Sequence, residues 1–294
     1  MIDAEARPAA HPVIGHISDT ARWVAVYRAM ETERPDAIFR DPYARRLAGA
    51  RGEEIVRTLK RGRSMAWPMI VRTAVMDEII LRSVEREGVD CVLNMAAGLD
   101  ARPYRLPLPS SLRWIEADLP AMVAYKTEKL AGETPVCALE RVAADLTDPT
   151  ARRSLFARAA EGASAILVVT EGLLAYLAPE QVAALAGDLA AEPAMRLWLI
   201  DIASPRLKKM LDRRVGRHVG EANAPFRFAP AEGTRFFEPR GWKEREFRST
   251  IEEGMRLDRK PKMAWLLSLM LRLGSAARRE EMRRMGGIVL LDRI

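Results

Sequence analysis

The chain has 294 residues, of which 49% are apolar and 30% are charged, and this composition excludes a disordered chain. No uncharged apolar run approaches the roughly 20 residues that a membrane span needs, and the first residues lack the apolar core of a secretory signal. We therefore expect a soluble, cytoplasmic protein without membrane contact, and the formal net charge of +7 raises the question of an acidic partner.

The first part of the chain, residues 19–87, has the apolar spacing of helices. Turn residues interrupt this pattern at Arg34-Pro35-Asp36 and at Asp41-Pro42. These features predict a helical N-terminal cap over residues 1–88.

Seven strand-like runs follow, and helix-length stretches separate most of them. They are DCVLNM, LRWIEAD, LERVAAD, SAILVVTE, RLWLIDIA, WKEREFRS and GGIVLLDR. The first four are almost continuously apolar, as in the central strands of a parallel sheet. The pattern predicts an α/β fold, a doubly wound, seven-stranded, mostly parallel Rossmann-like sheet in residues 89–294. Without a repeat or a linker we expect a single domain over residues 1–294, with an irregular insert at about 204–239 near the mouth of the site.

The basic excess lies in the C-terminal part of the chain. Residues 1–200 contain 25 Lys and Arg against 27 Asp and Glu, whereas residues 201–294 contain 22 against 13. Acidic residues are mixed with these basic ones, and aromatic residues are not interleaved with them as in a nucleic-acid interface. We predict solvated helix faces, with a basic rim that attracts an acidic small substrate as the alternative, and we expect no nucleic-acid partner.

The turn after the first strand, within residues 91–106, predicts close contact with a ligand. Ala96, Ala97 and Gly98 allow the backbone to approach a ligand, and Pro103 suits the first turn of a helix whose N-terminus would lie over the site. The turn matches neither G-x-G-x-x-G nor the P-loop, which favours a nucleoside-like ligand without a pyrophosphate. An ordinary turn between a strand and a helix is the alternative.

Acidic residues end the next three strands. Asp118 lies 20 residues after Gly98, the spacing at which an acid binds ribose hydroxyls, and Asp145 could accept from an adenine amino group. Glu171 ends the fourth strand. Helix capping explains Asp118 and Asp145 as well when each is taken alone. Because parallel strands bring these ends to one edge of the sheet, we predict a ligand site there.

The motifs NMAAGLDARPYRL, WIEADLP, AADLTD and VVTEGLLAYLAPEQ resemble, in this order, those of class I S-adenosylmethionine-dependent methyltransferases. The similarity is to the leucine carboxyl methyltransferase type, and within it to the bacterial small-molecule O-methyltransferases. SDTARWVAVYRAME, FRDPYA, VRTAVMDE, FFEPRGW and GGIVLLDR extend the resemblance over nearly the whole chain. It implies S-adenosylmethionine as the cofactor.

The resemblance also implies roles for individual residues. Arg72 matches an arginine that pairs with the carboxylate of the cofactor's methionine part, for which the alternative is a surface arginine paired with Asp77 or Glu78. The other implied cofactor contacts are Ala96, Gly98, Asp118, Asp145, Leu146 and Glu171. The family has glycine where Ala96 stands and threonine or serine where Ala101 stands, so we expect a loop slightly farther from the cofactor, with one hydroxyl fewer.

Methyl transfer requires a nucleophile, a methyl group and a sulfur atom held in line in a dry pocket. A carboxylate acceptor is already ionised at neutral pH, which agrees with the absence of a catalytic dyad or triad in the sequence. A phenol or enol acceptor would need a base, for which His16, His218 and Glu171 are the candidates. Tyr176 could face the acceptor, with core packing as the alternative, and Arg28 could orient a ligand, with a solvated helix face as the alternative.

The function predicted on these grounds is O-methylation of a small, acidic metabolite, with a carboxylate as the expected acceptor. Methylation of a protein C-terminal carboxylate is the second option, and a non-catalytic module that binds the cofactor or nucleic acid is the third. The two cysteines and three histidines have none of the spacings of metal-binding motifs, so we expect no metal.

Overall fold

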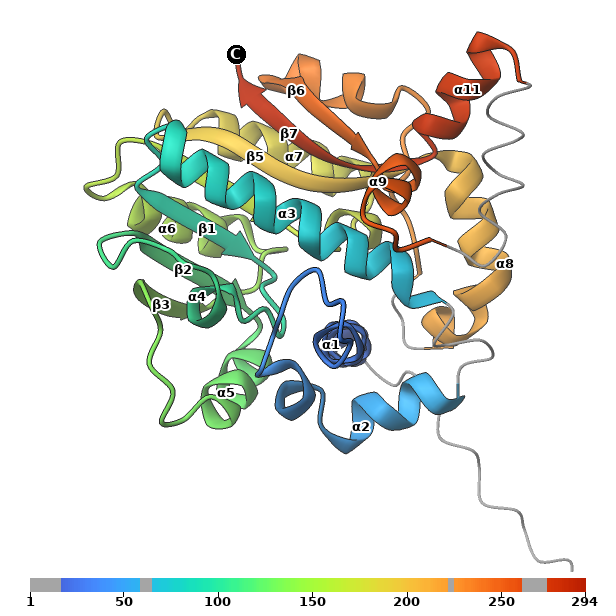
Figure 1. The fold of residues 1–294 in the computed structure, drawn as a ribbon. Coiled ribbons are helices and arrows are strands. Elements are labelled where there is room, and N and C mark those ends of the chain that lie inside the picture. Colours follow the sequence, from blue (N-terminus) through green and yellow to red (C-terminus); the bar gives the residue numbers. More distant parts are fainter. Residues whose placement is uncertain (1–16, 59–64, 222–224, 261–273) are drawn as a thin grey trace, which may run out of the picture.

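The computed structural model describes residues 17–58, 65–221, 225–260 and 274–294, which form a seven-stranded sheet flanked by helices (Figure 1). The predicted strands are all present, each within two residues of the expected position. They are β1 (Cys91–Met95), β2 (Arg113–Asp118), β3 (Ala138–Ala143), β4 (Ile166–Thr170), β5 (Met195–Ala203), β6 (Trp242–Ser249) and β7 (Gly286–Arg293).

The strand order is β3-β2-β1-β4-β5-β7-β6, and β7 is antiparallel to both of its neighbours. The chain builds outward from β1 to β3 and then returns to place β4 on the other side of β1. This reversal creates a switch point at the carboxyl ends of β1 and β4, where ligands bind in open α/β sheets. The prediction of a doubly wound, mostly parallel sheet is confirmed.

Helices cover both faces of the sheet, because alternate strand residues point to opposite sides. Val92, Leu167 and Leu199 pack against α3 on one face, whereas Leu93 and Val168 pack toward α6 and α7 on the other (Figure 1). The principal helices are α1 (Ile17–Thr32), α2 (Ala44–Thr58), α3 (Ala66–Arg86), α5 (Pro120–Lys129), α6 (Pro149–Ala160), α7 (Pro179–Ala190), α8 (Pro205–Glu221), α9 (Thr250–Arg256) and α11 (Ala276–Arg283).

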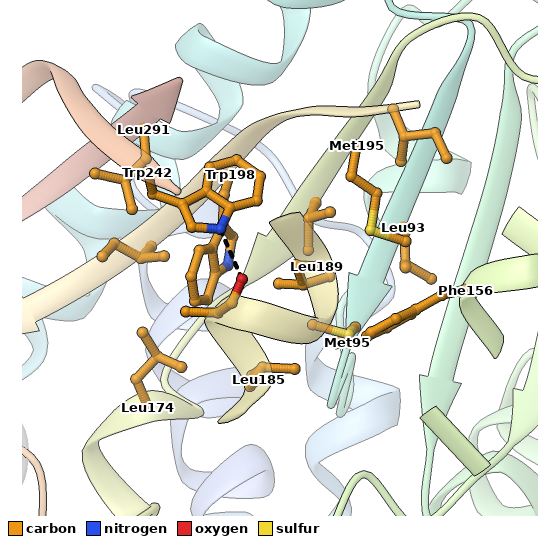
Figure 2. Close-up of a cluster of buried hydrophobic side chains, with 14 of the residues drawn as sticks. Leu93, Met95, Phe156, Leu174, Leu185, Leu189, Met195, Trp198, Trp242 and Leu291 are labelled. Carbon is orange, nitrogen blue, oxygen red and sulfur yellow. Dashed lines mark hydrogen bonds between the residues drawn. The ribbon is translucent and has the colours of Figure 1, made fainter. Parts of the chain in front are cut away.

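Two tryptophans anchor the core on the α7 face of the sheet (Figure 2). The rings of Trp198 and Trp242 meet edge to face with centroids 5.4 Å apart. Their indole N–H groups donate to Thr170 Oγ1 (3.0 Å) and to the Ala186 carbonyl (2.9 Å), so neither buried donor lacks a partner. This packing fixes β5 and β6 against α7.

The N-terminal helices α1 and α2 pack on the loop that follows β1. Their apolar side chains form a core of their own with Leu99, Tyr104 and Met122. The helix α1 ends at Thr32, just before the predicted turn at Arg34-Pro35-Asp36. The helix α3 extends this region onto the face of the sheet.

The helix expected after β1 begins at the predicted place and is short. The helix α4 (Arg102–Arg105) is a single turn, because Leu106 is extended and precedes Pro107. Ala101 stands at its N-cap without a side-chain hydrogen bond, and Asp100 Oδ1 instead accepts from the Arg102 N–H at 2.8 Å. A single turn has only a small helix dipole, so its N-terminus contributes little to the binding of a ligand.

The predicted irregular insert is also corrected in its first half, because residues 205–221 form α8. Residues 225–232 are irregular and lead to the 3-10 helix η3 (Gly233–Arg240), and the 3-10 helix η2 (Leu174–Tyr176) precedes α7. Among the described residues, no helix is long and apolar enough to cross a membrane.

Candidate active site

The loop after β1 and the end of β2 are held together by one carboxylate. Asp118 Oδ2 accepts from the Gly98 N–H and Asp118 Oδ1 from the Leu119 N–H, both at 2.7 Å. Ala96 and Gly98 adopt left-handed backbone angles, with φ of 52° and 49°. A Cβ added at Gly98 would lie 3.2 Å from the Ala21 side chain on α1, so the loop and α1 are in close contact. The structure therefore brings Gly98 and Asp118 together, as expected for residues at the ends of neighbouring parallel strands.

A buried charge cluster lies beside Asp118, around a small cavity of about 10 Å³. Glu116 pairs with Lys126 Nζ at 2.8 Å and accepts from Arg141 Nε at 3.0 Å. Burial raises the pKa of Asp118, although the Gly98 and Leu119 N–H groups and Lys126 act in the opposite direction. Sequence reasoning missed Glu116, although the period of two along β2 places it on the same face as Asp118.

At the end of β3, Asp145 is exposed, and Oδ1 accepts from the Thr147 N–H (2.9 Å) and hydroxyl (2.7 Å). These hydrogen bonds lower the pKa of Asp145. The N-cap of α6 is Asp148, which accepts from the Thr150 N–H, so the alternative that Asp145 caps this helix is wrong. Leu146 is half-buried and packs toward the core.

Arg72 reaches from α3 to the ends of β4 and β5. Its Nε donates to Glu171 Oε1 at 3.0 Å and its Nη1 to Asp201 Oδ2 at 2.9 Å. Asp201 Oδ1 also accepts from the Gly172 N–H at 2.6 Å. The alternative pairing of Arg72 with Asp77 or Glu78 is therefore wrong. Asp201 was missed, because the apolar pattern assigned it to the body of a strand.

Glu171 also forms an ion pair with a second arginine. Arg102, only 2% exposed, donates to Glu171 Oε2 (2.8 Å), Asp100 Oδ2 (2.7 Å) and Asp77 Oδ1 (2.6 Å). Burial opposes ionisation of Asp100 and Glu171, but the nearby positive charges together outweigh it and hold both pKa values below their usual range. These charges are Arg102, Lys126, Arg105 and Arg28 at Asp100, and Arg102 and Arg72 at Glu171. Arg102 and Asp100 were not predicted, since charged residues in a turn are ordinarily solvated, and Asp77 was considered only as a partner of Arg72.

Arg28 lies inside the protein and not on a solvated helix face, so that alternative is wrong. Its Nε donates to Asp41 Oδ2 at 2.8 Å and its Nη2 to the Leu99 carbonyl at 2.5 Å. The side chain is 8% exposed. Arg28 thus connects α1 to the loop after β1.

Tyr176 ends η2 and stacks on Phe226, with ring centroids 5.5 Å apart. Burial raises the pKa of its phenol. The Arg227 N–H donates to the Ala175 carbonyl at 2.7 Å, so the segment before η3 lies against η2. His16 and the side chain of His218 fall outside the described part of the chain.

Comparison with known proteins adds to this geometry. A sequence model described as leucine carboxyl methyltransferase matches residues 21–190, a stretch that includes Arg72, Gly98, Asp118 and Glu171. A protein of Mycobacterium sp. (strain KMS) named "Putative S-adenosyl-L-methionine-dependent methyltransferase" is 36% identical over 178 residues, which are 56% of this chain and 58% of that protein. This match spans little more than half of the relative's length.

A second protein of the same strain and name is 32% identical over 251 residues, covering 77% of this chain and 82% of that protein. Among solved structures, a DUF574 family protein from Streptomyces avermitilis superposes with a TM-score of 0.59 at 15% identity. The superposition covers 94% of this chain and 97% of that one. At this identity the likeness concerns the fold.

Proposed function

Because the chain belongs to the leucine carboxyl methyltransferase family, we propose that it transfers the methyl group of S-adenosylmethionine to an oxygen atom of a small metabolite. The observation that carries this proposal is a pair of contacts at the carboxyl ends of neighbouring parallel strands, that of Gly98 with Asp118 and that of Arg72 with Glu171. When bound, the cofactor would supply a methyl group on a positively charged sulfur. The oxygen of the acceptor would bond to the methyl carbon as the carbon–sulfur bond breaks, and S-adenosylhomocysteine would be the leaving group.

The residues at the switch point fit the polar ends of this cofactor. Asp118 uses one lone pair of each oxygen for a backbone N–H, which leaves lone pairs for ribose hydroxyls. Asp145 is exposed at the next strand end and offers its carboxylate to the adenine amino group. A loop with a single glycine suits a nucleoside without a pyrophosphate.

Arg72 stands between two acids, which matches the methionine part of the cofactor. The guanidinium is complementary to a carboxylate, while Glu171 and Asp201 are complementary to the neighbouring ammonium group. In the structure the two acids already use the Nε and Nη1 donors of Arg72. We infer that binding of the methionine part rearranges these ion pairs.

The state of Glu171 supports a carboxylate as the methyl acceptor. Both of its oxygens accept from arginines, and its pKa is lowered, so it is a weak base. A phenol or enol would profit from a base near the methyl group, whereas a carboxylate needs none. The role of the protein is then to position the acceptor and to exclude water, for which Tyr176 is the candidate beside the site.

A methyl-transfer assay with methyl-labelled S-adenosylmethionine and bacterial extract tests the proposal. We expect label in the small-molecule fraction and its release by mild base, because methyl esters are base-labile. The variant Asp118→Asn should bind S-adenosylhomocysteine about tenfold or more weakly by calorimetry, since a charged acceptor of the ribose hydroxyls is lost.

The matched control is Glu128→Gln, an exposed change on α5, which should bind like the unmodified protein. Label in the protein fraction would favour a protein C-terminal carboxylate, and base-stable label would favour a phenol or enol. Absence of S-adenosylhomocysteine binding would overturn the proposal.

A further inference from the structure

A second cavity, of about 370 Å³, lies on the flank of α3. It forms where α3 faces the segment before α2, the end of α4 and the residue after α9, and we name it the α3 flank pocket. None of its lining residues lines the small cavity beside Asp118. Its volume is in the range of small-molecule sites. Its apolar wall consists of Ile38, Phe39, Ala74, Leu81, Leu106 and Leu257.

A buried guanidinium with an unused donor lines the α3 flank pocket. The side chain of Arg105 is 3% exposed, and its Nη1 and Nη2 donate to Asp77 at 2.7 and 2.8 Å. Arg105 Nε has no hydrogen-bond partner among the described residues, and Asp41 Oδ2, at 4.0 Å, is too far away. Most buried donors have a hydrogen-bond partner, so the open Nε is compatible with an acceptor in the pocket.

The charges around the α3 flank pocket favour an anion. Arg40 at its rim is exposed and donates to the Thr32 carbonyl at 2.8 Å, and no carboxylate of the described residues pairs with it. The two acidic residues that line the pocket already have ion-pair partners. Asp77 pairs with Arg102 and Arg105, and Glu78 pairs with Arg248 and Arg256. The unmatched charge is therefore positive, while the two acids disfavour a ligand with several negative charges.

We propose that the α3 flank pocket binds a small amphipathic monocarboxylate. The hydrocarbon part lies against the apolar wall, and the carboxylate faces Arg40 and Arg105. An ion-pair chain through Asp77, Arg102 and Glu171 connects this pocket to Arg72, but the pocket shares no lining residue with the cavity beside Asp118, so we take the two as distinct sites. The proposal does not depend on the proposed function.

Titration calorimetry of the full chain with octanoate, in the absence of cofactor, tests this proposal. We expect saturable binding of one octanoate per chain, and binding of 1-octanol about fivefold or more weaker, because the neutral alcohol has no charge for Arg40. Arg40→Gln should weaken octanoate binding about fivefold or more and leave 1-octanol binding unchanged. Leu81→Glu, which places a negative charge in the apolar wall, should abolish octanoate binding while the circular dichroism spectrum stays native.

The matched control is Arg45→Gln, an exposed arginine on α2 that does not line the pocket and should leave binding unchanged. Three results would overturn the proposal. They are absence of saturation up to about 5 mM octanoate, equal affinities for octanoate and 1-octanol, and displacement of octanoate by S-adenosylhomocysteine, which would place it in the active site.

Discussion

Ala96 carries a side chain in a backbone conformation that glycine adopts at no cost. Its φ of 52° lies in the left-handed region, where a Cβ costs about 1 to 2 kcal/mol. The family resemblance places a glycine at this position. The structure shows why a glycine suits it, because the turn after β1 is left-handed at residues 96 and 98 alike.

The substitution Ala96→Gly should therefore stabilise the protein. Relief of the left-handed strain outweighs the greater entropy of an unfolded glycine, and we expect a gain of about 0.5 to 1 kcal/mol in urea unfolding. Ala97→Gly is the control, because residue 97 has no left-handed φ and loses a buried methyl group. Equal losses in the two variants would contradict the strain argument.

At the scale of single residues, the sequence predicts those site residues whose position follows from a strand end. Gly98, Asp118 and Glu171 lie at such ends, and the structure places each at the switch point. Arg102, which donates to Glu171, and Asp201, which accepts from the Gly172 N–H, could not be predicted, because these contacts join residues 69 and 29 positions apart. Only the folded sheet brings such segments together.

An ion pair connects the segment after α9 to α1. Arg259 Nη2 and Nε donate to the two oxygens of Glu31 at 2.8 and 2.9 Å, and the Glu31 side chain is fully buried. The Ile38 N–H also donates to Glu31 Oε1 at 2.9 Å. Glu31 thus holds the end of α1, the following turn and the residue after α9 in one arrangement.

Loss of Arg259 should destabilise this arrangement strongly. In Arg259→Met the buried Glu31 carboxylate loses its charge partner, and we expect a decrease of about 3 to 5 kcal/mol in the free energy of unfolding. Urea denaturation measures this decrease in the free energy of unfolding. Arg34→Met, which removes a half-exposed arginine 3.7 Å from the same carboxylate, should cost less than about 1 kcal/mol. A similar loss in both variants would show that burial does not set the strength of the pair.

At the scale of elements, the apolar runs predict all seven strands, while the length of one helix and the presence of another are not predicted. The helix α4 stops after one turn because Pro107 and Pro109 follow it closely, a signal present in the sequence. The helix α8 has apolar residues at helical spacing, namely Leu207, Leu211, Val215 and Val219, but this signal was overlooked among the basic residues of segment 205–221. Helix propensity and packing against the edge of the sheet together determine whether such a segment forms a helix.

For the molecule as a whole, stability should fall on acidification. Asp100 and Glu171 have lower pKa values in the folded than in the unfolded chain, so their contribution is complete above pH values near 4 and is lost as the pH falls through the folded values. The pKa of Asp118 is raised in the folded protein, so the contribution of this group to stability increases as the pH falls. We expect an almost constant Tm between about pH 6 and 8 and a decrease below about pH 4.5.

Thermal unfolding followed by circular dichroism at several pH values checks this expectation. The variant Glu171→Gln should be less stable at neutral pH and should lose less of its stability on acidification, because one of the two ionised groups is gone. An unchanged pH dependence in this variant, or a Tm that rises between pH values of about 6 and 4, would contradict the assignment.

The place of β7 in the sheet also determines when folding can finish. Strand β6 (Trp242–Ser249) pairs with β7 alone, and β7 (Gly286–Arg293) lies between β5 and β6. A nascent chain on the ribosome that has reached only residue 260 therefore exposes one edge of β5, and β6 has no neighbour. During synthesis the five parallel strands can assemble early, whereas the last edge of the sheet waits for residue 293, and this interval is when a growing chain is most open to chaperones and to mispairing.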